Sequence, residues 1–168
     1  MSARCRIGIK NDDGTITSIY CHSDGYLGGV GAVLADYYGE EREVRSLLEL
    51  GDLSVLGQEI GDKIPFDQRA WVPSPRGKGW TDQALQCVSY SRDCGGVWSL
   101  AAVSVSFDDL KRERLLGGFG PEHLYLFYPG LGWRWFPYPF FEDKGRLLSE
   151  ALAEVQQAIN RGEPWAGR

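Results

Sequence analysis

A turn-forming run near the start of the chain limits the possible folds most strongly. The run Asn11-Asp12-Asp13-Gly14 separates two stretches rich in β-branched residues. Asn, Asp and Gly tolerate the left-handed backbone conformations of a tight turn, and β-branched side chains favour extended strands. We therefore predict a β-hairpin within residues 6–26, whose second strand leads into a polar and aromatic cluster at residues 20–26 and then into a helix.

The register of this hairpin decides which side chains share a face of the sheet. A loop formed by residues 11–15 places Ile7 and Ile19 on one face, with Tyr20 and His22 on the other. A loop shorter by one residue reverses that assignment. The sequence leaves both registers open.

Hydrophobic periodicity predicts the remaining elements. Helices are expected at residues 29–38, 41–50 and 108–116 and between Asp143 and Gly162, a single helical turn at 52–57, and strands at 84–90, 97–105, 123–128 and 132–138. Strands at both ends of the chain with helices between and after them are typical of the α+β class. We expect a mainly antiparallel sheet of hairpins with helices packed on one face.

The length of 168 residues suits a single domain with its own core. Residues 61–82 lack periodicity, and we expect a long irregular loop there, anchored by Trp71 and Trp80. A loose tail is expected at 163–168. Many aromatic residues fall within 119–141, and the sequence leaves open whether they form core or surface.

The composition predicts a soluble protein of the cytoplasm without membrane contact. The sequence contains no apolar run of the roughly eighteen residues that a membrane span needs, and its start lacks the apolar stretch of a signal peptide. The cysteines at positions 5, 21, 87 and 94 form no C-x-x-C pair and are expected to be reduced thiols. We expect no cofactor and no metal.

Negative charge is concentrated in the first third of the chain. Residues 1–60 contain ten Asp and Glu against five Lys and Arg, whereas the remaining residues contain thirteen of each. This excess disfavours direct binding of nucleic acid and favours a partner protein with a basic surface; a solvated acidic face is the simpler interpretation. The candidate partner-binding residues are Asp12, Asp13, Asp36, Glu40, Glu41 and Glu43.

Short runs near both ends of the chain carry a resemblance to known sequences. They are Arg6-x-Gly8-Ile9, Asp13-Gly14-Thr15, Ile19-Tyr20-Cys21-His22-x-Asp24-Gly25-Tyr26, Tyr90-x-Arg92-Asp93-x-Gly95 and Tyr125-Leu126-Phe127 followed by Gly132-Trp133. Together they resemble a family of small uncharacterised proteins encoded by tailed bacteriophages and prophages. That family carries no assigned chemistry, so the resemblance implies a phage genome rather than a reaction.

Polar and aromatic residues after two predicted strands have the types found in binding sites. If those strands are neighbours, Arg92 and the tyrosines are placed to hold a phosphate and a base; alternatively, Arg92 forms a structural ion pair with Asp24. Catalytic-triad, phosphate-loop and zinc-finger spacings are absent from the sequence, and we assign no catalytic residue. The candidate ligand ridge consists of Tyr20, His22, Asp24, Tyr26, Tyr90, Arg92 and Asp93.

Three functions are compatible with these patterns. The first is a phage-encoded, non-enzymatic inhibitor that binds a host protein, such as a CRISPR-Cas effector or another defence component, through its acidic surface. The second is a small-ligand binder that sequesters a nucleotide signal, for which a homo-oligomer is a common state. The third is a small hydrolase that uses His22 and Asp24.

Overall fold

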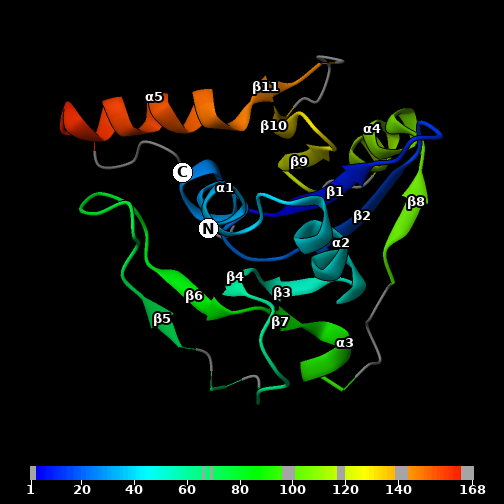
Figure 1. Cartoon of the computed structure of the whole chain (residues 1–168), viewed down its shortest axis with the longest axis horizontal. Helices are drawn as coiled ribbons and strands as arrows, with labels where there is room; N and C mark the ends of the chain where they lie inside the picture. The colour runs from blue at the N-terminus through cyan, green and yellow to red at the C-terminus, as the bar shows by residue number, and fades with distance from the viewer. Residues whose placement is uncertain are drawn as a thin grey trace.

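The computed structural model describes residues 3–65, 67–68, 70–95, 101–116, 120–138 and 144–163, with the backbone alone for 113–116. A mixed sheet runs through the centre of the molecule, helices pack against it, and a smaller sheet lies beside it (Figure 1). The predicted α+β class is therefore confirmed. The loose tail predicted at 163–168 lies outside the described residues except for Glu163.

The predicted hairpin forms β1 (Cys5–Lys10) and β2 (Ile16–Cys21). Lys10 pairs with Ile16, so residues 11–15 form the loop, and the first of the two predicted registers is the one observed. Within the loop, the Asn11 N–H donates to the Thr15 carbonyl at 2.9 Å, and Gly14 has a φ of 86°. That φ suits glycine, which has no Cβ to clash in the left-handed region.

The hairpin lies in the middle of the main sheet, whose strand order is β11-β10-β9-β1-β2-β3-β7, with β8 paired to β2. β9 runs parallel to β1 and β3 runs parallel to β2, whereas the other pairings among the described strands of this sheet are antiparallel. The added strands are β3 (Leu53–Val55), β7 (Val88–Ser89), β8 (Val103–Val105), β9 (His123–Tyr128), β10 (Gly132–Pro137) and β11 (Arg146–Leu147).

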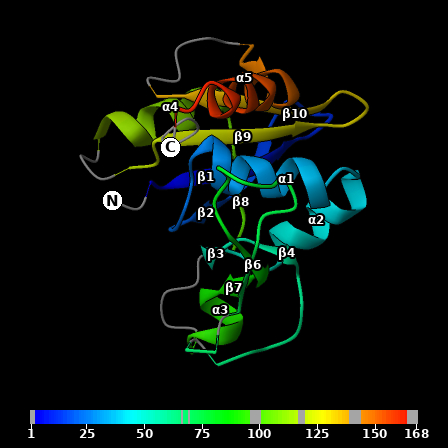
Figure 2. The same cartoon turned by 90° about the vertical axis from the view of Figure 1, so that its left-hand side faces the viewer.

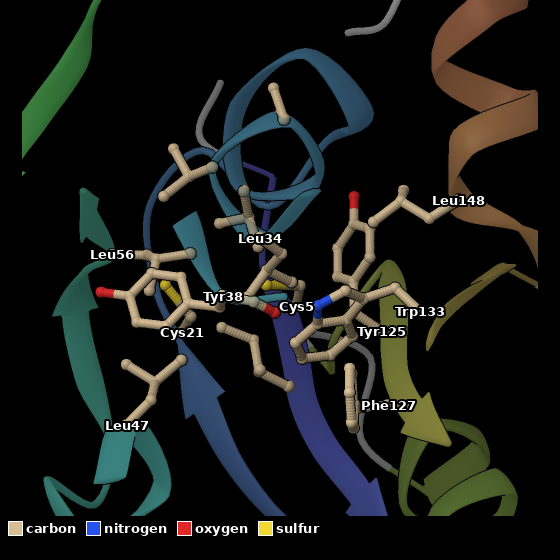
Figure 3. Close-up of a cluster of buried hydrophobic side chains, with 14 of the residues drawn as sticks. Cys5, Cys21, Leu34, Tyr38, Leu47, Leu56, Tyr125, Phe127, Trp133 and Leu148 are labelled. Carbon is tan, nitrogen blue, oxygen red and sulfur yellow. Dashed lines mark hydrogen bonds between the residues drawn. The ribbon is translucent and has the colours of Figure 1, made fainter. Parts of the chain in front are cut away.

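One face of this sheet carries the larger part of the core. It is covered by the π-helix η1 (Leu27–Gly31), α1 (Ala32–Tyr37), α2 (Glu41–Glu49) and α5 (Leu148–Asn160). Two buried hydrogen bonds tie the strands to this helical layer: Trp133 Nε1–H donates to the Tyr38 carbonyl at 2.7 Å, and the Tyr125 hydroxyl donates to the Gly25 carbonyl at 2.9 Å. Figure 3 shows Tyr38 beside Trp133 and Tyr125 within this core.

The opposite face carries a smaller apolar cluster. Leu110 of α4 (Phe107–Leu116) packs there with Ile16, Leu126 and Phe136. Most of the helical cover thus lies on one face of the sheet, and α4 adds a shorter contact on the other.

The aromatic residues of β9 and β10 divide between the two faces. Tyr125, Phe127 and Trp133 are buried on the face that carries α1 and α5, and Phe136 is buried on the α4 side. Tyr138, just after β10, is exposed. These residues are mainly core; Phe119, Phe140 and Phe141 lie outside the described residues.

The smaller sheet contains β4 (Gly57–Glu59), β6 (Gln83–Gln86) and β5 (Trp71–Val72), in the order β4-β6-β5. Figure 2 shows β4 and β6 beyond β1 and β2, on the side away from α5 and β10, with α3 (Tyr90–Asp93) farther out. The irregular segment 61–82 therefore contributes a short strand. Trp80 anchors it as predicted, because this side chain is buried and its Nε1–H donates to Gln156 at 2.8 Å. Trp71 does not, since it is 46% exposed.

The strand predicted at 97–105 is observed only as β8, with 97–100 outside the described residues, and the helix predicted between Asp143 and Gly162 begins at Leu148, after the short strand β11. Two other predictions about secondary structure are wrong. Residues 52–57 contain strand β3 rather than a helical turn. The single strand predicted at 84–90 is divided between β6 and β7, which belong to different sheets, and the short helix α3 (Tyr90–Asp93) follows. In both places a short apolar run was compatible with more than one structure.

Candidate functional site

The strands that were expected to carry the ligand ridge are not adjacent. β3 lies between β2 and β7, so the two halves of the ridge are separated by one strand. Of the seven ridge residues, Tyr20 contacts His22, and the backbone N–H groups of Tyr20 and Tyr90 both donate to Asp52. The other four ridge residues lie elsewhere and have other partners: Asp24, Tyr26, Arg92 and Asp93.

Tyr20 and His22 form a contact on the side of the sheet away from α1. The Tyr20 hydroxyl lies 3.2 Å from His22 Nδ1, and the Tyr20 backbone N–H donates to Asp52 Oδ1 at 2.8 Å. Burial raises the pKa of Tyr20; Tyr90 raises it further, and the positive charge of Arg4 opposes both effects.

An arginine on the same face of the sheet as Tyr20 comes from β1, not from the segment after β7. Arg6 is the register partner of Tyr20, and its Nη1 donates to Ser18 Oγ at 3.3 Å. Sequence reasoning gave Arg4 and Arg6 no role. The observed hairpin register, which is one of the two predicted, implies that Arg6 and Tyr20 share a face, because directly paired residues on antiparallel strands do so.

Asp24 and Tyr26 shape the turn between β2 and η1. Asp24 has a φ of 57°, the one positive value at a non-glycine position among the described residues. The Tyr26 side chain is buried, and its hydroxyl donates to Asp24 Oδ1 at 3.3 Å. A Cβ at Gly29 would lie 2.3 Å from the Asp24 carbonyl oxygen, so this close approach requires glycine. Asp24 and Tyr26 therefore fix the backbone conformation of this turn.

Arg92 and Asp93 form a structural latch rather than a ligand site. All five guanidinium N–H groups are used: they donate to the Asp93 carboxylate and to the carbonyls of Ile60, Gly61 and Cys87 at 2.6–3.0 Å. Burial would raise the pKa of Asp93, but hydrogen bonds from Arg92 and from the backbone N–H groups of Ser89 and Ile64 lower it below its usual value. The predicted Arg92–Asp24 pair is replaced by Arg92–Asp93.

The six candidate acidic residues come from two places. Asp12 and Asp13 lie in the β1–β2 loop, where the Asp13 carboxylate accepts the Thr15 N–H at 2.9 Å and the Thr15 hydroxyl at 2.7 Å. These bonds lower the pKa of Asp13. The other four belong to the corner where α1 meets α2: Asp36, Glu40, Glu41 and Glu43.

Each acidic residue of this α1–α2 corner has a partner within the chain. Asp36 accepts two hydrogen bonds from Arg76, at 2.7 and 2.9 Å, and Glu41 pairs with Arg45. Glu40 and Glu43 form a capping box at the start of α2, in which each side chain accepts a backbone N–H of the other. The four carboxylates are therefore held on ordered backbone. In the capping box, the partners of the Glu40 and Glu43 carboxylates are backbone N–H groups rather than basic side chains.

A groove of about 490 Å³ opens beside this corner. Both views of the molecule show α1 and α2 next to β4 (Figures 1 and 2). The groove is lined by Arg42 and Glu43 of α2, by Tyr37 of α1, and by Gln58, Glu59 and Ile60 at and after β4. Its volume lies in the range of ligand-binding clefts. Sequence reasoning missed Tyr37, Gln58 and Glu59, because the groove forms only when α2 packs beside β4.

The half-buried His123 and the buried Cys5 and Cys87 are poorly suited to catalysis. Burial lowers the pKa of His123 to about 4, and its Nδ1 accepts the Trp135 Nε1–H at 3.0 Å. Burial raises the pKa of Cys87 to about 11 and that of Cys5 well above its usual value. Thiolates are the reactive form of cysteine, so the thiols of Cys5 and Cys87 are unreactive near neutral pH. All four cysteines are free thiols, and Cys94 is exposed.

Within the described residues, no group of three His, Cys, Asp or Glu side chains is arranged to hold a metal ion. Among the same residues, no helix is both long enough and apolar enough to cross a membrane. Searches against protein-family models, curated proteins and solved structures found no match to this chain.

Proposed function

We propose that this chain is a phage-encoded, non-enzymatic interaction protein that binds a basic surface of a host protein and inhibits it in the cytoplasm of the bacterial host cell. The target class is a defence component such as a CRISPR-Cas effector, whose nucleic-acid groove is basic. The observation that carries the proposal is the α1–α2 corner, where exposed Glu40 and Glu41 lie beside a groove that contains Glu43 and Glu59.

The local charges at this corner support a basic partner. Arg76 and Arg45 offset the charges of Asp36 and Glu41, but Glu40, Glu43 and Glu59 remain against Arg42. The capping box fixes the first turn of α2, so a partner does not have to order this backbone on binding. Complementary charge of this kind speeds association and makes a complex sensitive to salt.

The test is affinity capture from host lysate with three forms of the protein. The first is wild type, and the second is the Glu41→Lys, Glu59→Lys variant, which keeps the capping residues Glu40 and Glu43. The third is the control Glu122→Lys, Glu154→Lys. The two variants are matched, because each changes the charge equally, alters two exposed residues and breaks one surface ion pair, Glu41–Arg45 or Glu154–Arg146.

We expect wild type and the control to retain the same basic protein, and the Glu41→Lys, Glu59→Lys variant to lose it. Retention should fall as salt is raised. Equal retention by all three forms, or no basic protein retained by wild type, would overturn the proposal.

A second candidate function is binding of a nucleotide, and one observation favours it. Arg6 shares a sheet face with Tyr20, and Tyr20 contacts His22, which brings a guanidinium near two aromatic rings. The test is analysis of heated, deproteinised protein for released nucleotide, in wild type and Arg6→Ala. A nucleotide released by wild type and absent from the variant supports this function, and its absence from both excludes it.

A further inference from the structure

We propose that the groove between α2 and β4 binds an arginine side chain on a basic segment of the partner protein, an inference that rests on the proposed function. The occupant is an arginine because the groove combines carboxylates with an aromatic side chain and the partly buried Ile60. A planar guanidinium can stack on a ring while it donates to a carboxylate, and its aliphatic stem can cover apolar surface.

Two carboxylates lie on opposite walls of the groove. Glu43 belongs to the first turn of α2, and Glu59 is the last residue of β4. Both line the groove together with Tyr38. Burial raises the pKa of Tyr38 most, and Cys87 and the charges of Glu43 and Glu59 raise it further. A cation between these walls would interact with both carboxylates.

The walls are held in place by hydrogen bonds of the groove's own lining residues. Glu43 Oε2 accepts the Glu40 N–H at 3.0 Å, and the Gln58 amide donates to Gln83 Oε1 at 3.0 Å. The Tyr38 hydroxyl donates to the Gly57 carbonyl at 2.9 Å, which joins the end of α1 to β4. The binding geometry is therefore largely formed before a ligand arrives, which lowers the entropic cost of binding.

The chain already holds one of its own arginines in this way next to the groove. Arg76 donates to both oxygens of Asp36, and its guanidinium carbon lies 4.9 Å from the centre of the Trp80 ring. Asp36 immediately precedes Tyr37, which lines the groove. The same pair of chemical groups, a carboxylate and an aromatic ring, is offered by Glu59 and Tyr37.

Arg42 provides a control, because its substitution should change the affinity for an arginine ligand in the opposite direction to substitution of Glu59. Arg42 also lines the groove, and its positive charge would repel an incoming cation. Glu59→Gln should therefore weaken binding of an arginine ligand roughly two- to fivefold, and Arg42→Gln should strengthen it by a similar factor. A structural effect of either substitution would not produce opposite changes.

The test is a nuclear magnetic resonance titration of the full chain with a blocked Gly-Arg-Gly peptide and, in parallel, a blocked Gly-Gln-Gly peptide. We expect amide shifts within residues 37–46 and 57–60 with the arginine peptide, and much smaller shifts with the glutamine peptide. Glu59→Gln should weaken the response, whereas the control Glu122→Gln should not. Equal responses to the two peptides, shifts confined to other segments, or an unchanged affinity in Glu59→Gln would overturn the inference.

Lysate capture separates this inference from the proposed function. A basic protein that binds wild type and Glu59→Gln with equal affinity, and is lost by the Glu41→Lys, Glu59→Lys variant, overturns the arginine groove but leaves the acidic interaction surface. A wild-type chain that captures no basic protein overturns both.

Discussion

Arg92 and Asp93 are consecutive in the chain and form an ion pair with each other, with Arg92 Nε 2.9 Å from Asp93 Oδ1. The Asp93 side chain is fully buried, and the same guanidinium donates to carbonyls at the end of β4 and next to β7. One side chain thus links the small sheet to the main sheet.

Loss of this link should be costly. Arg92→Ala should lower the free energy of unfolding by about 3 kcal/mol, because it leaves a buried carboxylate without its cation. Arg92→Lys should restore little, since an ammonium cannot reproduce the forked guanidinium geometry. Denaturant unfolding measures both changes. The exposed pair Arg112–Asp109 is the control, and Arg112→Ala should cost less than about 1 kcal/mol. Equal costs for Arg92→Ala and Arg112→Ala would show that Arg92 is not a latch.

Gly57 is required by the close approach of β4 and β6. A Cβ there would lie 2.1 Å from the backbone carbon of Gln86, so Gly57→Ala should prevent stable folding or cost more than about 4 kcal/mol. Gly39→Ala is the matched control, because nothing lies within 4 Å of its Cβ position. Thermal unfolding should leave Gly39→Ala within a few degrees of wild type. A Gly57→Ala protein as stable as this control would contradict the close contact between β4 and β6.

His123 should make the fold sensitive to mild acid. Its pKa is about 4 in the folded state against an ordinary value of 6.5, because burial disfavours the charged ring. The unfolded chain therefore binds the proton first, and stability falls as pH drops from about 6.5 towards 4. Between pH 7 and pH 4.5 the loss from this residue is roughly 2 kcal/mol. Urea unfolding of wild type and His123→Gln at both pH values should show a smaller loss in the variant; identical losses would refute this role.

The thiols should differ sharply in reactivity. Cys94 is exposed, whereas Cys5, Cys21 and Cys87 are buried. A disulfide reagent added to native protein at neutral pH should therefore modify one thiol rapidly and the other three only after denaturation. Cys94→Ser should abolish the rapid phase. Rapid modification of a second thiol in native protein would contradict the burial of the other cysteines.

Local sequence signals predicted the elements whose partners are near in the chain. The turn chemistry of residues 11–15 identified the hairpin, and the observed register is one of the two it allowed. Periodicity identified α5, because its apolar stripe is long enough to exclude a strand. The short run Leu53–Val55 could not be assigned in the same way, since its structure is decided by pairing with β2 and β7.

The candidate site was less predictable, because it depends on segments far apart in the sequence. Arg92 is surrounded by carbonyls of residues 60, 61 and 87, and nothing local indicated that they would converge there. Glu59 became relevant only when β4 packed beside α2. The acidic residues at 40–43 were identified from charge alone, but their role as helix caps was not.

Amide hydrogen exchange tests most directly whether a basic partner is bound at the α1–α2 corner. Exchange would be measured for the chain alone and in complex with the protein that it captures from host lysate. We predict slower exchange in the complex within residues 37–46 and 57–60, and unchanged exchange around Tyr20 and Arg6. Slower exchange confined to β1 and β2, with none at the corner, would contradict the proposed binding surface.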